Sequence, residues 1–158
     1  MKRIIMLTAA AAFSAAVSIV VAAETVTLPK GYEKWEKSKQ QVESDKKSLF
    51  YGIHYTYVNK TAMKTYRKGN GHYPEGSQFV VVQYGIRQQD GKPVQGKKSM
   101  IVLMKKDKRY KETGGWLFAG FTPQGKPSGL DPVKNCYECH VKEAADRDLV
   151  ISRFADFR

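Results

Sequence analysis

The run Gln78-Phe79-Val80-Val81-Val82-Gln83-Tyr84 is the most strand-like stretch of the chain. Branched and aromatic side chains favour the pleated backbone of a strand, and we expect this strand to continue to Arg87. Further strand-like runs are Leu49 to Val58, Ser99 to Met104, Trp116 to Phe121 and Leu149 to Phe154. Turn residues such as Asp90-Gly91 separate them, as is typical of hairpins. The sequence therefore predicts an antiparallel sheet of four or five strands.

Helical signals flank this sheet. We predict helices at Lys30 to Ser48, which is highly charged with a weak apolar face, at 60 to 68, and in a C-terminal segment beginning at Asp131 or Asn135. Asn59 can cap the second of these helices, and Gly69 can end it. Together the strands and helices predict an α+β fold.

Both cysteines of the chain lie in Cys136-Tyr137-Glu138-Cys139-His140. A zinc site normally needs four ligands, and the other two histidines are single and distant in sequence. A thioredoxin-like redox pair belongs in a βαβ pattern, which this sequence lacks. Covalent haem attachment explains all three residues, because each thiol can bond one haem vinyl group while the next imidazole points to the iron. We therefore predict a C-terminal haem-attachment helix, with one haem c on Cys136 and Cys139 and with His140 as an axial iron ligand.

The N-terminus has the pattern of a secretory signal. Met1-Lys2-Arg3 is basic, Ile4 to Val20 has no charged residue, and Val21-Ala22-Ala23 is a small-residue cleavage pattern. We predict cleavage before Glu24, which leaves residues 24–158 as a single haem c-binding domain in the periplasm. A retained membrane anchor is the alternative, but the stretch is rich in Ala and Ser and passes straight into the cleavage site. The periplasmic address also suits covalent haem, which is typically attached outside the cytoplasm.

The chain is strongly basic. It has 27 Lys and Arg against 15 Asp and Glu, a formal net charge of +12. An exported protein rarely meets nucleic acid, and no nucleic-acid motif is present, so we expect no such partner. The lysines are spread along the chain, which favours a solvated basic surface. The alternative is electrostatic attraction toward an acidic redox partner or an anionic membrane surface.

A series of short motifs is similar to the cytochrome P-460 family, which includes the cytochromes c′-beta. The motifs are Leu28-Pro29-Lys30-Gly31-Tyr32, Gly52-Ile53-His54, Tyr73-Pro74-Glu75-Gly76-Ser77, Met104 to Phe118 with Thr113-Gly114-Gly115-Trp116 at its centre, and the Cys-x-x-Cys-His run. The match covers nearly all of residues 24–158. The resemblance implies a homodimer on a large antiparallel sheet, with a pentacoordinate haem whose open face binds small ligands. The haem-binding roles carry over onto Cys136, Cys139 and His140.

This family divides on one lysine. In the cytochromes P-460 proper, that lysine is cross-linked to the porphyrin, and these proteins oxidise hydroxylamine. The c′-beta members lack the cross-link and bind nitric oxide or carbon monoxide in an apolar pocket. The lysine lies on the strand after the Tyr-Pro-x-Gly-Ser segment, and here Val81 falls near that place, on the same strand face as Phe79. We therefore expect Phe79 and Val81 in an apolar distal haem pocket, closer to the c′-beta type. A displaced cross-link from Lys64, Lys68 or Lys98 stays open.

Three functions stay open, and they differ in the occupancy of the sixth iron position and in the presence of the lysine cross-link to the porphyrin. A free position predicts binding of nitric oxide or another small gas, and a lysine cross-link predicts an enzyme that oxidises hydroxylamine. A methionine or histidine ligand predicts an electron carrier, although core packing is the more usual role of the three candidates, Met63, Met100 and Met104. His54 is a candidate distal ligand or proton relay, but a single strand histidine is more often hydrogen-bonded or half-exposed. The apolar strand favours gas binding, and we assign no catalytic residue.

Overall fold

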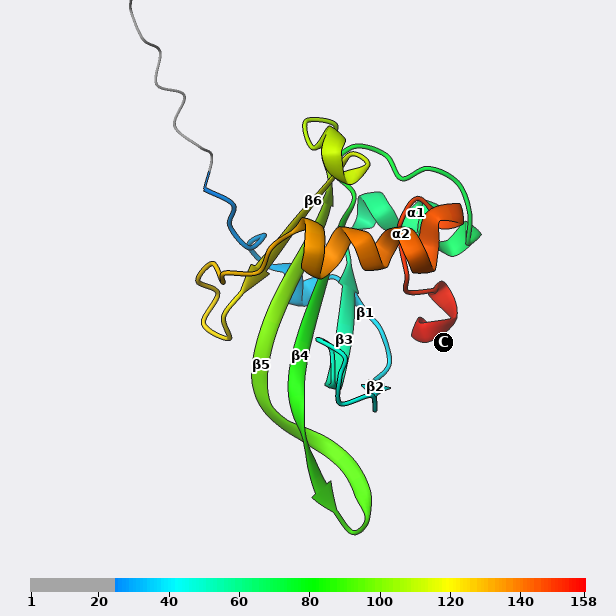
Figure 1. Cartoon of the computed structure of the whole chain (residues 1–158). Coiled ribbons are helices and arrows are strands. Elements are labelled where there is room, and N and C mark those ends of the chain that lie inside the picture. The colour runs from blue at the N-terminus through cyan, green and yellow to red at the C-terminus, as the bar shows by residue number, and fades with distance from the viewer. Residues whose placement is uncertain (1–24) are drawn as a thin grey trace, which may run out of the picture.

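The computed structural model describes residues 25–158, and the predicted signal peptide lies outside them. Within these residues six strands form one antiparallel sheet in the order β1-β3-β4-β5-β6, with β2 also paired to β3 (Figure 1). The strands are β1 (Glu36–Lys37), β2 (Gln41–Glu43), β3 (Gly52–Val58), β4 (Gln78–Gln89), β5 (Lys92–Lys106) and β6 (Trp116–Phe121). The helices are α1 (Lys60–Lys68) and α2 (Glu138–Ala144), with short helical turns η1 (Tyr32–Lys34), η2 (Lys111–Thr113), η3 (Val133–Tyr137), η4 (Ala145–Arg147) and η5 (Phe154–Phe157). The predicted α+β class is confirmed.

The long β4–β5 hairpin turns at the predicted dipeptide. Asp90 and Gly91 have φ values of +52° and +72°, the left-handed backbone that a two-residue hairpin turn requires at both positions. The strands pair from this turn to the body of the sheet, so β5 begins at Lys92 rather than at Ser99 as predicted. The hairpin projects well beyond the rest of the molecule (Figure 1). Backbone pairing across the tight turn explains the extension, because the exposed part of β5 has little apolar character.

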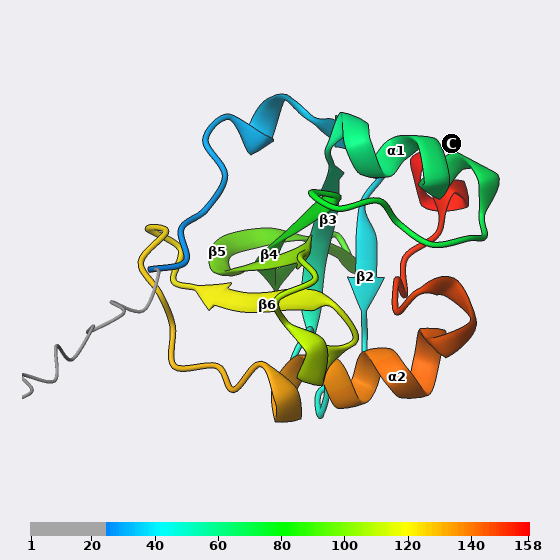
Figure 2. The same ribbon diagram turned by 90° about the horizontal axis from the view of Figure 1, so that it is seen from above.

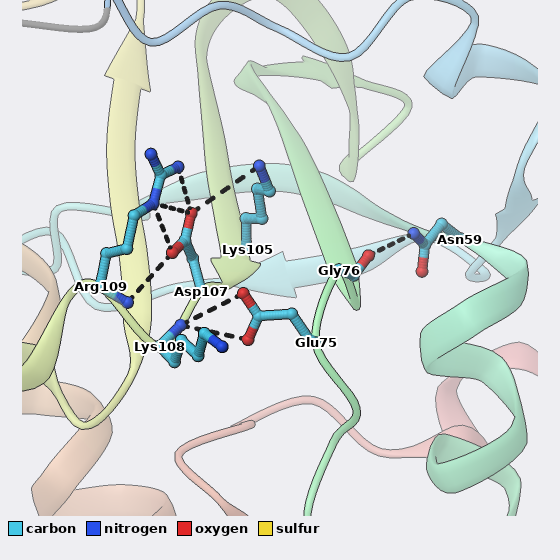
Figure 3. Close-up of polar contacts among 7 residues, drawn as sticks. All are labelled: Asn59, Glu75, Gly76, Lys105, Asp107, Lys108 and Arg109. Carbon is cyan, nitrogen blue, oxygen red and sulfur yellow. Dashed lines mark hydrogen bonds and ion pairs between the residues drawn. The ribbon is translucent and has the colours of Figure 1, made fainter.

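Helix α1 has the predicted boundaries because both caps work as expected. The Asn59 side chain accepts a hydrogen bond from the Ala62 amide at 2.9 Å, and Gly69 ends the helix with φ +77°. The same asparagine donates through Nδ2 to the Gly76 carbonyl at 2.9 Å, as Figure 3 shows. Asn59 thus fixes the start of α1 against the segment that leads into β4.

The predicted helix at Lys30 to Ser48 is wrong. This segment forms η1 and then the two short strands β1 and β2, which pair along the same edge of β3. Tyr32 is buried there and packs edge to face on Tyr57, with ring centroids 5.5 Å apart. Pairing with β3, the next strand along the chain, outweighs the weak helical pattern, because the segment has too narrow an apolar face to pack as a helix.

The predicted strand at Leu149 to Phe154 is also wrong. Asp148 and Leu149 both have left-handed φ values, so the backbone cannot enter the segment in an extended conformation. At its end the Arg153 amide donates to an Asp156 carboxylate oxygen at 2.8 Å, which begins η5. The segment is therefore an irregular connection that returns from the end of α2 toward α1 (Figure 2).

The sheet packs on both faces. On one face lies a cluster that we call the packed face: Tyr32, Tyr57, Val80, Val82, Ile101, Leu103 and Phe121. On the other face β4, β5 and β6 contribute Phe79, Met104, Trp116 and Phe118, which pack with α1 residues and with Cys136; we call this the helix face. Alternation along β4 produces the division, because neighbouring strand residues point to opposite sides.

A buried carboxylate with partly exposed cationic partners organises the turn between β5 and β6. Asp107 is 3% exposed and accepts hydrogen bonds from the Arg109 side chain, the shortest at 2.7 Å, with Lys105 3.9 Å away (Figure 3). The hydrogen bonds from Arg109 are the main cause that lowers the pKa of Asp107 to about 2. Glu75 accepts from the Lys108 amide and joins the segment before β4 to this turn.

Candidate functional site

A cavity of about 400 Å³ lies between the helix face of the sheet and α2. The sheet supplies an apolar wall from three neighbouring strands: Phe79 and Val81 on β4, Val102 and Met104 on β5, and Phe118 on β6. The helix supplies His140. The structure therefore brings the predicted iron ligand and both predicted pocket residues, Phe79 and Val81, to one cavity.

His140 presents a nitrogen suited to bind a metal. Its Nδ1 lies 2.5 Å from the Leu149 carbonyl oxygen, and its ring is 4.9 Å from that of Phe118. A carbonyl oxygen only accepts, so Nδ1 carries the hydrogen and Nε2 keeps its lone pair. Burial lowers the pKa of His140, with the Leu149 contact acting in the opposite direction. The ring is thus held neutral with one nitrogen able to coordinate iron.

The two cysteines lie on the same helical segment as His140. Cys136 is in the π-helical turn η3 and is buried in the helix face, while Cys139 is on α2 and is exposed. Burial raises the pKa of the Cys136 thiol to about 11, with further contributions from Cys139 and Asp131. Among the described residues, His140 lines the cavity and neither cysteine does. The two thiols therefore belong to the helical segment that brings the imidazole to the cavity.

One side of the cavity is polar, which the expectation of an apolar pocket did not include. Its residues are Gln41, Glu43, His54, Thr56, Ser152 and Asp156. His54 Nδ1 is buried and has no hydrogen-bond partner among the described residues. Burial lowers the pKa of His54, and the nearby carboxylates of Glu43 and Asp156 act against that shift. This side of the cavity can accept and hold protons.

Sequence reasoning found this polar side only in part. Alternation along β3 places His54 and Thr56 on the same side of the strand, so the sequence signal for these two was present. Glu43 lies in the segment that was wrongly predicted as a helix. Asp156 follows directly after the segment that was wrongly predicted as a strand. Only the pairing of β2 with β3 and the return of the C-terminal segment bring the two carboxylates to the cavity.

The other candidate residues are distributed differently. Of the described residues that line the cavity, none is a lysine, so Lys64, Lys68 and Lys98 all lie elsewhere. Met104 lines the cavity, whereas Met63 is buried on α1 and Met100 is half-buried on β5. His72 is 95% exposed in its side chain, in agreement with the usual behaviour of a turn histidine.

The arrangement fits the haem that the Cys-x-x-Cys-His run predicts. An apolar wall suits a porphyrin, His140 offers an uncommitted Nε2, and His54, whose buried Nδ1 has no hydrogen-bond partner among the described residues, also lines the cavity. Across residues 25–158, no helix has both the length and the apolar character needed to cross a bilayer.

Comparison with known proteins gives one positive result. The family model described as cytochrome P-460 matches residues 29–152, which is most of the chain. A comparison with curated proteins finds no match.

Proposed function

This chain belongs to the cytochrome P-460 family, which implies a haem cofactor, and we propose on that premise that it is an exported c-type haem protein that binds a small gas. The observation that carries the proposal is the cavity with His140 on its helical side and an apolar sheet wall opposite. In this proposal Cys136 and Cys139 hold the haem covalently and His140 Nε2 coordinates its iron. The spacing of the two thiols and the free Nε2 support these roles.

The wall of the cavity supports a neutral ligand. The bound haem would supply an iron with one free coordination position. Phe79 and Val81 offer only carbon to a molecule near that wall, so they disfavour water and anions and admit nitric oxide or carbon monoxide. The lack of a lysine among the described cavity residues supports a haem without the cross-link of the hydroxylamine-oxidising members.

We extend the proposal to compartment and partners. The N-terminal pattern supports cleavage near Ala23 and a periplasmic location. Cleavage removes Lys2 and Arg3 and leaves the exported chain with a net charge of +10, which supports an acidic redox partner. The family resemblance supports a homodimer. N-terminal sequencing of the exported protein and its mass in solution test the first and third points.

Spectroscopy of the reduced protein tests the gas-binding role. Nitric oxide, carbon monoxide and hydroxylamine are added separately to purified ferrous protein, and the haem absorption bands are followed. We expect band shifts with both gases and no turnover of hydroxylamine. A spectrum already six-coordinate before addition would contradict the proposal and point to electron transfer, with Met104 or His54 as the sixth ligand.

Two neighbouring valines provide a matched pair for this experiment. Val81 lines the cavity, whereas Val82 is 2% exposed on the packed face. Val81→Ala widens the cavity and is expected to change the rate of gas association. Val82→Ala removes the same carbon atoms from the opposite face and is expected to leave that rate unchanged. Equal rates in all three proteins would argue that the gas does not enter this cavity.

Hydroxylamine oxidation is the second candidate, because the cavity has acid–base groups. That oxidation releases protons together with electrons, and His54, Glu43 and Asp156 are placed to accept them. Steady oxidation of hydroxylamine with an artificial acceptor, lost in His54→Gln, would favour the enzyme. A peptide mass that contains lysine bonded to haem would favour it independently of His54.

A further inference from the structure

The orientation of His140 depends on a backbone carbonyl in an unusual turn. The Leu149 carbonyl accepts from His140 Nδ1, and it follows directly after two residues with left-handed backbone. Asp148 has φ +48° and Leu149 has φ +67°, values that residues with a side chain rarely adopt. Two such residues in succession persist only where their surroundings hold them in place.

The Asp148 carboxylate provides that hold. Its side chain is 9% exposed, its Oδ1 accepts from Lys106 Nζ at 2.7 Å, and its Oδ2 accepts from the Tyr73 amide at 2.8 Å. Trp116 Nε1 approaches Oδ1 at 3.4 Å. These partners come from β5, from the segment before β4 and from β6. One carboxylate therefore ties the turn that carries the Leu149 carbonyl to three parts of the sheet.

We propose that Asp148 is a positioning residue for the iron ligand. It anchors the turn, the turn places the Leu149 carbonyl, and the carbonyl fixes the direction and the electron-donating strength of the His140 ring. A fixed acceptor on Nδ1–H makes Nε2 a stronger ligand. The anchored turn thus strengthens the bond from His140 to iron and favours the ferric state. The inference rests on the proposed role of His140 as iron ligand.

The test compares two buried aspartates in the haem-loaded protein. Asp148→Asn removes the charge while keeping a residue that tolerates left-handed backbone. Asp107→Asn is the matched control, because Asp107 is also a largely buried carboxylate paired with a cation, but its hydrogen bonds go to Arg109 in the turn after β5 and not to the turn that carries the Leu149 carbonyl. Resonance Raman spectra of the ferrous protein give the iron–histidine stretching frequency, and a redox titration gives the midpoint potential. For Asp148→Asn we expect a lower frequency and a more positive potential, and for Asp107→Asn no change in either.

Lys106→Met gives a second measurement if Asp148→Asn does not fold. It leaves Asp148 with the Tyr73 amide but without its ion pair, and it should move both quantities in the same direction by less. A folded Asp148→Asn or Lys106→Met protein with the wild-type frequency and potential overturns the inference. Equal shifts in Asp107→Asn overturn it too, because they would reflect general loosening. A wild-type spectrum with no iron–histidine band instead overturns the role of His140 itself, and the inference with it.

Discussion

The two faces of the sheet use neighbouring residues of the same strands for different purposes. On the packed face Leu103 is 2% exposed among other apolar side chains, with the N-terminal segment packed against that cluster. On the helix face the next residue, Met104, lines a cavity of about 400 Å³. Close packing on one face secures the fold, and this leaves the other face free to keep a space for a ligand. A strand can therefore serve stability and binding at once, with each function confined to alternate residues.

The largest effect is expected from replacing both cysteines, which should release the haem from its covalent bonds without disturbing the packed face. In Cys136→Ala/Cys139→Ala we expect complete loss of covalent haem, because no thiol remains to bond a vinyl group. Acidified organic solvent should extract the haem, and the intact mass should lack it. Each single variant should keep one bond and therefore keep its haem. Haem that stays with the double variant after extraction would contradict the attachment sites.

Truncating the side chains of Leu103 and Met104 in separate variants compares the packing on the two faces of the sheet directly. Leu103→Ala should lower the free energy of unfolding by about 2–5 kcal/mol, because it opens a cavity among close-packed residues. Met104→Ala should lower it by less, since the lost volume joins a cavity that already exists. Urea denaturation measures both values. An equal loss in the two variants would mean that the faces do not differ in packing.

Acid sensitivity should come partly from the polar side of the cavity. Burial lowers the pKa of His54 in the folded chain, so the unfolded chain binds more protons once the pH falls below about 6.5. Stability should therefore be full above that pH and decline as the pH falls toward the lowered value. His54→Gln should flatten this decline. Unfolding measured from pH 8 to pH 5 checks this, and an equal decline in His54→Gln and the wild type would contradict it.

The smallest effect is expected on the outer surface of α2. Glu143 lies 3.7 Å from Lys142, and both side chains are largely exposed. Glu143→Gln should change the free energy of unfolding by no more than about 1 kcal/mol, because water screens such pairs. The haem spectrum should not change. A larger loss would indicate that this surface is covered in the assembled protein.

Patterns of neighbouring residues predicted those parts of the fold that depend on neighbouring residues, namely a strand, the caps of a helix and a turn. Strand β6 has the predicted limits, Trp116 and Phe121, and α1 begins and ends at its predicted caps. The β4–β5 turn forms at Asp90-Gly91 because only left-handed backbone closes it. In each case the residues that determine the structure are adjacent in sequence.

Long-range contacts explain what the sequence could not predict. Within residues 30–48, β1 and β2 form because β3 offers an edge with which to pair, and that edge lies outside the segment itself. The same pairing carries Glu43 to the cavity, and the turn at Asp148 carries Asp156 there. The predicted apolar wall matches the residues on β4, but the polar side belongs to segments whose partners no local pattern reveals.

The projecting β4–β5 hairpin makes a practical attachment point for a reporter group. Its tip at Asp90-Gly91 is eight residues or more along β4 from Val81, roughly 26 Å at the rise of an extended strand. Exposed loop tips tolerate insertion well, because no buried backbone partner is lost. A dye placed there would lie far from the haem and would tumble with the long arm that carries it. Its fluorescence anisotropy would therefore report the size of the assembly, and so the number of chains in it, without a change to the cavity.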